Sequence, residues 1–181
     1  MKSPENNLSK KPGTPQEKIK ESFLNNSIDF NTLRNKWFKL DQRGILHTKH
    51  AADNIKMLED PGVKEKIESL KKENQITYYY MLSVSYFHQA QKNPNLPDIE
   101  KAFEYAQKTS ENETYQYWHD YLKGILAYFK KDKNSLKTII NQIKNVENNK
   151  TILEKLVRSL EKGDEPEKSY KSILFKNKIK K

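Results

Sequence analysis

Residues 78–92 read YYYMLSVSYFHQAQK and residues 115–130 read YQYWHDYLKGILAYFK, and these two stretches decide the fold class. Between Tyr78 and Phe129 lie 13 of the 19 aromatic residues of the chain. In the first stretch, Tyr79, Leu82 and Tyr86 follow one another at intervals of three and four residues. This interval places side chains on one face of an α-helix. Both stretches are therefore expected to be helices that supply the largest apolar side chains of the core.

The segments on either side show the same helical spacing. Before the aromatic stretches, helices are expected over residues 16–25, from an N-cap at Asn31 to Gly44, over 48–59 and over 63–73. After Tyr86, helices are expected behind Asp98, behind Asp132, over 152–160 with an end at Gly163, and from Pro166 onward. The chain has only 5 glycines in 181 residues, too few for the tight turns of a β fold. The fold class is predicted to be all-α.

Composition predicts the organisation of the chain. Residues 1–15 are rich in proline and poor in apolar side chains, which predicts a disordered N-terminal tail. Residues 16–175 are expected to form a single all-helical domain with a repeat-like core over 76–146, and residues 176–181 a basic C-terminal tail. No window approaches the roughly 18 apolar residues of a membrane span. We therefore expect a cytoplasmic protein with no membrane span.

The aromatic pattern repeats itself. Tyr79, Tyr86 and Phe87 recur 42 residues later as Tyr121, Tyr128 and Phe129, and a second amphipathic helix follows each copy. The pattern predicts two antiparallel helical hairpins with equivalent tyrosines.

These hairpins resemble the tetratricopeptide repeat (TPR). The first unit reads Tyr79-x2-Leu82-Ser83-x2-Tyr86 followed by KAFEYA at 101–106, and the second reads Tyr121-x2-Gly124-Ile125-x2-Tyr128. Ser83 stands where the family has a packing glycine, and the spacing exceeds the usual ~34 residues. The resemblance covers about residues 76–146. It implies hairpins stacked as a short TPR-like α-solenoid, with a concave side that binds partner peptides.

Four tyrosines lie off the main apolar stripe and are the candidate residues of that groove. They are Tyr78, Tyr80, Tyr115 and Tyr117. Rings beside lysines are also typical of surfaces that stack the bases of single-stranded nucleic acid. A third interpretation places the rings in the core, which their helical spacing favours. The expected function is a non-catalytic protein- or peptide-binding scaffold without a cofactor.

Basic residues suggest the alternative, a nucleic-acid-associated protein. The chain carries 34 Lys and Arg against 24 Asp and Glu, and residues 121–181 alone have 16 basic and 7 acidic residues, a net charge of +9. Lys outnumbers Arg by 31 to 3, which disfavours sequence-specific contacts and leaves weak, nonspecific attraction. The candidate basic patch consists of Lys171, Lys176, Lys178, Lys180 and Lys181. A docked final helix is the other interpretation of this segment.

Catalytic and metal sites receive little support. The absence of cysteine excludes thiolate zinc sites, and His47, His50 and Asp53 fan too widely around a helix to hold a metal. Arg43 and His50 are separated by six residues, which resembles the ribonuclease motif of the HEPN family. That resemblance implies His50 as a base and Arg43 on a phosphate, so a metal-independent ribonuclease is the enzymatic alternative. His119 and Asp120 are expected to point to different sides of their helix.

Overall fold

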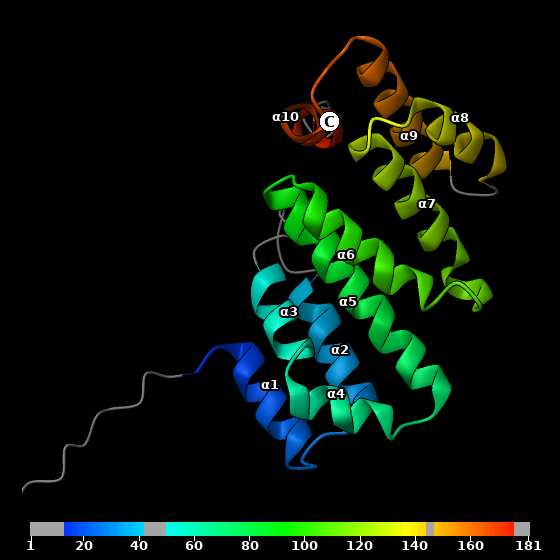
Figure 1. Ribbon diagram of the computed structural model, residues 1–181. Coiled ribbons are helices and arrows are strands. Elements are labelled where there is room, and N and C mark those ends of the chain that lie inside the picture. Colours follow the sequence, from blue (N-terminus) through cyan, green and yellow to red (C-terminus); the bar gives the residue numbers. More distant parts are fainter. Residues whose placement is uncertain (1–12, 42–49, 144–146, 176–181) are drawn as a thin grey trace, which may run out of the picture.

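The computed structural model describes residues 13–41, 50–143 and 147–175, and every regular element in these ranges is an α-helix (Figure 1). The helices are α1 (Pro15–Leu24), α2 (Phe30–Asp41), α3 (Ala51–Leu58), α4 (Pro61–Glu68), α5 (Lys72–Lys92), α6 (Leu96–Gln107), α7 (Glu113–Phe129), α8 (Lys133–Gln142), α9 (Glu147–Glu161) and α10 (Pro166–Phe175). The predicted all-α class is confirmed. None of the described helices combines the length and the apolar character that crossing a bilayer requires.

Side-chain caps set where most of these helices begin, although two of the predicted cap residues were wrong. The carboxylate of Asp29 accepts the backbone N–H of Thr32 at 2.8 Å, so α2 begins one residue before the expected cap at Asn31. In the same way, the side chain of Asn95 accepts the N–H of Asp98 at 2.8 Å, and α6 begins at Leu96. In both helices the capping side chain belongs to a polar residue that lies earlier in the chain than the predicted one. The predicted end at Gly44 lies outside the described residues.

The predicted stop after α9 is confirmed. Gly163 has a φ of 78°, a left-handed conformation that glycine adopts without steric cost. Around it, the N–H of Asp164 donates to the carbonyl of Ser159 and the N–H of Gly163 donates to that of Leu160, each at 3.1 Å. This pair of bonds is the Schellman pattern, which ends a helix and turns the chain back. The turn brings α10 beside α9.

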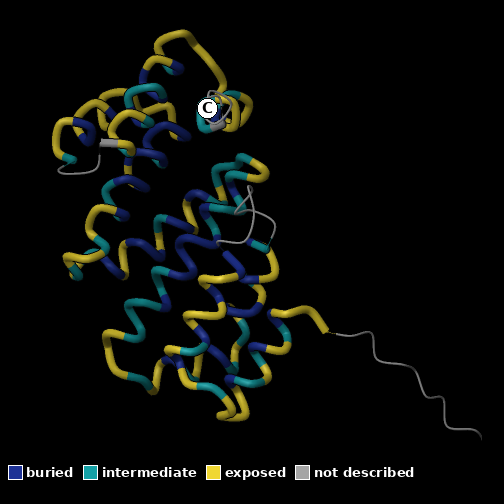
Figure 2. Tube along the Cα trace, turned by 180° about the vertical axis from the view of Figure 1, so that it is seen from behind, coloured by how far each residue is buried: buried dark blue, intermediate teal, exposed yellow. Residues whose placement is uncertain are grey.

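The first four helices form a bundle on one side of α5. Helices α2, α3 and α4 contact α5, and α1 lies against α2, α3 and α4 (Figure 1). The indole N–H of Trp37 on α2 donates to the hydroxyl of Ser85 on α5 at 3.2 Å, inside the protein. Buried residues line the inward sides of the helices, and exposed residues line the outer turns (Figure 2).

Helices α5 to α9 follow one another in space as they do in sequence. Each contacts the next, and α7 also contacts α9. Thr77 meets Tyr115 near the beginnings of α5 and α7, while Phe87 meets Tyr121 farther along both helices, so these two helices run parallel. Helices α7 and α9 are parallel by the same criterion, because Tyr128 contacts Ser159 beyond the close approach of Gly124 and Leu153. Helix α10 lies against α5, α7 and α9.

The 42-residue equivalence of tyrosines does not appear in the packing, so that expectation was wrong. The rings of Tyr79 and Tyr86 both stack on Tyr105 of α6, at 6.2 and 5.9 Å between centroids. Tyr128 instead bonds to Ser159 of α9, and its ring lies 6.1 Å from that of Tyr170 on α10. One set of rings therefore packs within its own hairpin, and the other packs against later helices.

Small residues on α5 and α7 contact the next parallel helix, and their spacing differs from the 42 residues that separate the tyrosines. Ser83 on α5 accepts the indole N–H of Trp118 on α7 at 2.8 Å. Gly124 on α7 lies so near α9 that an added Cβ would be 2.7 Å from a methyl carbon of Leu153. These two small residues, 41 positions apart, each face the next parallel helix. At Gly124 the close packing of α7 on α9 requires a small side chain, whereas Ser83 is reached from α7 by the long side chain of Trp118.

Candidate binding surface

Three of the four candidate tyrosines gather at the N-terminal ends of α5 and α7. The rings of Tyr80 and Tyr115 stack with their centroids 4.4 Å apart and an interplanar angle of 22°. The hydroxyl of Tyr115 lies 3.4 Å from that of Thr77, and the edge of Trp118 meets Tyr80 at 6.0 Å. Tyr117 is 41% exposed. We call Tyr80, Tyr115 and Tyr117 the aromatic surface.

Burial and neighbours determine the chemistry of this surface. Burial, followed by the nearby hydroxyl of Tyr117, raises the pKa of Tyr80 above the usual value for tyrosine. The Tyr80 hydroxyl therefore stays protonated at neutral pH and remains a hydrogen-bond donor. The ring of Tyr80 packs edge-on against Trp118, which is only 9% exposed. The surface offers flat apolar faces with polar hydroxyl tips, the combination that tyrosine brings to protein interfaces.

Tyr78 does not belong to this surface. Its ring is 2% exposed, and its hydroxyl donates to the carbonyl of Leu58 at 2.7 Å. Residues two positions apart on a helix point in nearly opposite directions, so Tyr78 and Tyr80 cannot share one face. Burial raises the pKa of Tyr78 as well, and its hydroxyl fastens α5 to the end of α3.

The C-terminal end of α7 carries rings that α10 covers. Tyr170 on α10 is fully buried, with its ring 5.1 Å from Phe129 and 6.1 Å from Tyr128. Its hydroxyl makes no hydrogen bond of normal geometry among the described residues, although it interacts with the hydroxyl of Tyr121, which adds to the effect of burial in raising the pKa of Tyr170. Helix α10 is therefore a docked helix, one of the two interpretations of the basic C-terminal segment. Lys171 lies exposed on this helix, whereas Lys176, Lys178, Lys180 and Lys181 lie outside the described residues.

Two of the histidines that the structure describes, His88 and His119, are held by neighbouring groups. His88 lies 2.9 Å from the buried carboxylate of Asp41, a contact that ties the end of α2 to α5. His119 contacts Asp120 at 3.1 Å and stacks on Phe103 at 5.3 Å, so the expectation that His119 and Asp120 point apart was wrong. A side chain can turn back along the helix to reach its neighbour, and the ring on Phe103 fixes this rotamer.

The residues proposed for metal binding and for ribonuclease activity are only partly described. His50 precedes α3 at its N-cap position and makes no side-chain capping bond. Arg43 and His47 lie outside the described residues. In the part of the chain that the structure covers, no three histidine or acidic side chains are grouped closely enough for a metal ion.

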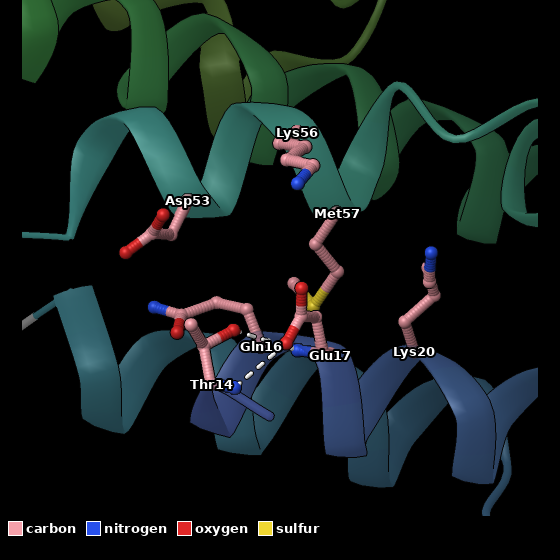
Figure 3. A pocket seen from close by; sticks show the side chains of 7 residues that line it. All are labelled: Thr14, Gln16, Glu17, Lys20, Asp53, Lys56 and Met57. Carbon is pink, nitrogen blue, oxygen red and sulfur yellow. Dashed lines mark hydrogen bonds between the residues drawn. The ribbon is translucent and has the colours of Figure 1, made fainter. Parts of the chain in front are cut away.

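Asp53 faces a small pocket of about 50 Å³ between α1 and α3 (Figure 3). Gln16 enters it from α1, is 2% exposed, and donates to the side-chain oxygen of Asn54 at 3.1 Å. The remaining oxygen of Gln16 and the amide nitrogen of Asn54 have no partner among the described residues. The space suits a single water that bridges such groups rather than a larger ligand.

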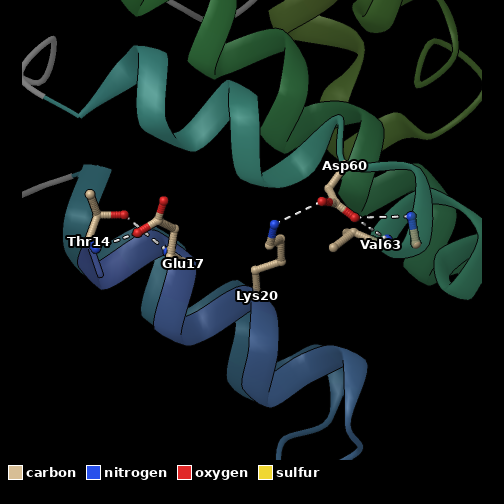
Figure 4. A network of polar contacts seen from close by, with 6 residues as sticks. Thr14, Glu17, Lys20, Asp60 and Val63 are labelled. Carbon is tan, nitrogen blue, oxygen red and sulfur yellow. Dashed lines mark hydrogen bonds and ion pairs between the residues drawn. The ribbon is translucent and has the colours of Figure 1, made fainter. Parts of the chain in front are cut away.

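A polar network beside this pocket fastens α1 to the following helices (Figure 4). Lys20 on α1 donates to the carboxylate of Asp60 at 2.9 Å, and the other oxygen of Asp60 accepts the N–H of Gly62 at 3.0 Å. The hydrogen bond from Lys20 lowers the pKa of Asp60. Asp60 therefore caps α4 and anchors α1 at the same time, which is a structural role.

No protein-family model, no curated protein and no solved structure matches this chain.

Sequence reasoning missed the contacts that join helices distant in the chain. Tyr105 donates to the carboxylate of Glu59 at 2.9 Å, and the ammonium of Lys108 lies 5.0 Å above the rings of both Tyr79 and Tyr105. No spacing within one helix predicts this cluster, because its members come from α5, from α6 and from the residues that follow α3 and α6. Its partly buried rings are held by neighbours on each side, so we assign it a structural role.

Proposed function

We propose that this chain is a non-catalytic module that binds a protein or peptide partner through the aromatic surface of Tyr80, Tyr115 and Tyr117. The observation that carries the proposal is the stacked pair Tyr80–Tyr115 beside the 41% exposed ring of Tyr117. Tyrosine and tryptophan dominate the energetically important residues of protein interfaces. Rings that are already fixed lose little side-chain entropy when a partner binds.

We also propose that α5 to α9 form a short stack of helical hairpins similar to a TPR array. The support is the parallel course of α5, α7 and α9, with α6 and α8 as the intervening helices. A second support is the recurrence of a small residue, Ser83 and then Gly124, where each parallel helix meets the next. Such stacks present extended surfaces to partner peptides.

The chemistry of the surface indicates the kind of partner. Flat ring faces favour apolar or aromatic side chains, and the phenol hydroxyls offer hydrogen bonds to a peptide backbone. We therefore expect a segment that carries at least one large apolar anchor. Glu113 and Asp120 lie four residues before and three residues after Tyr117, on the same face of α7, so neutral segments suit this surface better than acidic ones.

The test compares partner recovery by matched variants. The wild-type chain, the double variant Tyr115→Ala/Tyr117→Ala and the control Leu24→Ala are immobilised and exposed to lysate of the native host. Leu24 is an exposed apolar residue on α1, at 37% exposure. Loss of two interface tyrosines is expected to weaken binding at least tenfold, since each contributes about 1–2 kcal/mol or more. Quantitative mass spectrometry then identifies proteins retained by the wild type and the control and lost by the double variant.

The proposal fails if the double variant, shown by circular dichroism to be folded, retains the same proteins at the same level. Fluorescence titration with a peptide of a recovered partner would give the affinity directly. An equal loss by Leu24→Ala would place the binding surface elsewhere.

Ribonuclease activity through Arg43 and His50 is the enzymatic alternative that the sequence suggests. We propose that the chain lacks this activity. Purified protein is expected to leave RNA intact without added metal. Cleavage that disappears in His50→Ala would replace the binding proposal with an enzymatic one.

A further inference from the structure

Helices α9 and α10 border a hollow of about 510 Å³ that the aromatic surface does not include. The turn at Gly163 folds α10 back beside α9 and so creates this space. Its lining consists of Lys155, Arg158, Ser159, Lys162, Asp164, Lys168, Ser169, Ser172 and Ile173. Four of these nine residues are cationic, only one is acidic, and only Ile173 is apolar.

The cations form a row rather than a single point. Lys155, Arg158 and Lys162 follow one another at intervals of three and four residues, so they share one face of α9. The row extends over about 10 Å, since seven residues of helix rise 1.5 Å each. Lys168 adds a fourth cation from α10. Among the described residues, none of the four has a carboxylate within ion-pair distance.

The acidic residues nearest to the hollow are already engaged. Glu161 pairs with Lys137 of α8 at 2.7 Å, and Glu165 pairs with Lys131 of the turn before α8 at 2.9 Å. These lysines lower the pKa of both glutamates, which stay charged and paired. Asp164, the acid within the hollow, accepts a hydrogen bond from Ser159 at 2.9 Å. Arg158 and Lys168 also act on Glu161 and Glu165 through their charge, but the carboxylates of both glutamates pair with other lysines. The row of cations on α9 therefore has no ion-pair partner of its own among the described residues, and the lining of the hollow keeps a net positive charge.

We propose that this hollow binds the phosphodiester backbone of a nucleic-acid strand. A row of cations over about 10 Å matches an extended polyanion better than a single phosphate group. The single apolar side chain, Ile173, provides too little apolar surface to bind a lipid bilayer or an apolar ligand. Three lysines and one arginine neutralise phosphates but do not read base edges, so the strand is bound without sequence preference.

The experiment measures fluorescence anisotropy of labelled homopolymer strands of uridine and of thymidine, at salt concentrations from about 50 to 200 mM. The full chain is expected to bind both strands with a Kd of about 10⁻⁶ M or weaker near physiological salt. The variant Lys155→Ala/Arg158→Ala/Lys162→Ala is expected to bind at least about tenfold more weakly at the low salt concentration. For this variant, the slope of log Kd against log salt concentration should be smaller by about 2, because each phosphate contact on a single strand contributes about 0.7.

The control is Arg34→Ala/Lys36→Ala/Lys39→Ala on α2, which removes the same three charges from exposed positions. It is expected to change the affinity less than twofold. Equal weakening by both triple variants would show that only the total charge matters and would overturn the site. Absence of binding at low salt, or displacement of the strand by polyglutamate at equal charge concentration, would overturn the assignment to phosphodiesters.

Discussion

The two ends of α7 carry the same kind of residue in different surroundings. At the N-terminal end, Tyr117 is 41% exposed and Tyr115 is half-buried against Tyr80. At the C-terminal end, Tyr128 is fully buried, with its hydroxyl bonded to Ser159 and its ring close to Tyr170. The difference is α10, which lies against the second end. Tyrosine on this helix is therefore core or surface according to whether another helix covers it.

Removing the covering ring should have the largest effect on this contrast. Tyr170→Ala is expected to reduce the free energy of unfolding by about 3–5 kcal/mol, because it opens a cavity beside Tyr128 and Phe129. Tyr117→Ala, the matched substitution at the open end, should change it by less than about 0.5 kcal/mol. Urea denaturation followed by circular dichroism measures both. Similar losses in the two variants would remove the distinction between a covered and an open end.

The second prediction concerns the close contact between α7 and α9, which supports the covered end. Gly124→Ala is expected to cost about 1–2 kcal/mol, since its methyl would press on Leu153 while the gain in helix propensity returns up to about 1 kcal/mol. In the background Leu153→Ala, the same substitution should become stabilising. The double-mutant cycle isolates this coupling. Additive effects in the cycle would show that the two residues do not interact.

Two hydroxyl deletions compare the covered rings with each other. Tyr128→Phe removes a hydrogen bond to Ser159 and is expected to cost about 1 kcal/mol. Tyr170→Phe removes a buried hydroxyl that makes no hydrogen bond of normal geometry and only a weaker contact with the hydroxyl of Tyr121, so stability at pH 7 should be unchanged or slightly higher. Thermal unfolding of both variants under the same conditions ranks them. A cost for Tyr170→Phe equal to that of Tyr128→Phe would mean that its hydroxyl has an energetically useful partner.

Alkaline pH should test how completely the phenol of Tyr170 is buried at the covered end. Burial raises the pKa of Tyr170 well above 10, so its phenol stays protonated in the folded state while the unfolded chain releases the proton. Stability present at neutral pH is therefore lost as pH rises above about 10, by up to about 1.4 kcal/mol per pH unit for one tyrosine. Tyr170→Phe should lose less stability than the wild type between pH 10 and about 11. A curve for Tyr170→Phe that follows the wild-type curve would contradict the argument.

Periodicity in the sequence predicted which segments are helical, although the helix predicted over 63–73 is wrong because α4 ends at Glu68 and α5 begins at Lys72. It did not predict which helices cover one another. The spacing of Leu136, Ile139 and Ile140 correctly predicted the buried face of α8, because that pattern depends only on neighbours in the same helix. The equivalence of Tyr86 and Tyr128 failed because their partners, Tyr105 and Tyr170, come from different places in the chain.

The candidate surface was predicted in part for the same reason. Tyr80, Tyr115 and Tyr117 gather as the off-stripe positions suggested, whereas Tyr78 points toward α3, whose place beside α5 no local pattern specifies. The hollow between α9 and α10 depends on the direction in which the chain leaves Gly163. The basic composition of that region was evident from the sequence, but the row of unpaired cations required the positions of Glu161 and Glu165.

The docking of α10 on α5 and α7 has a consequence for the order of synthesis. A ribosome produces α7 long before residues 166–175, so the rings of Tyr128 and Phe129 stay uncovered in the nascent chain until α10 has emerged. A chain released early, at any point before Pro166, would keep this apolar patch exposed. Such a product would be open to chaperones, proteases and aggregation, whereas the full chain conceals the patch with its own tyrosine.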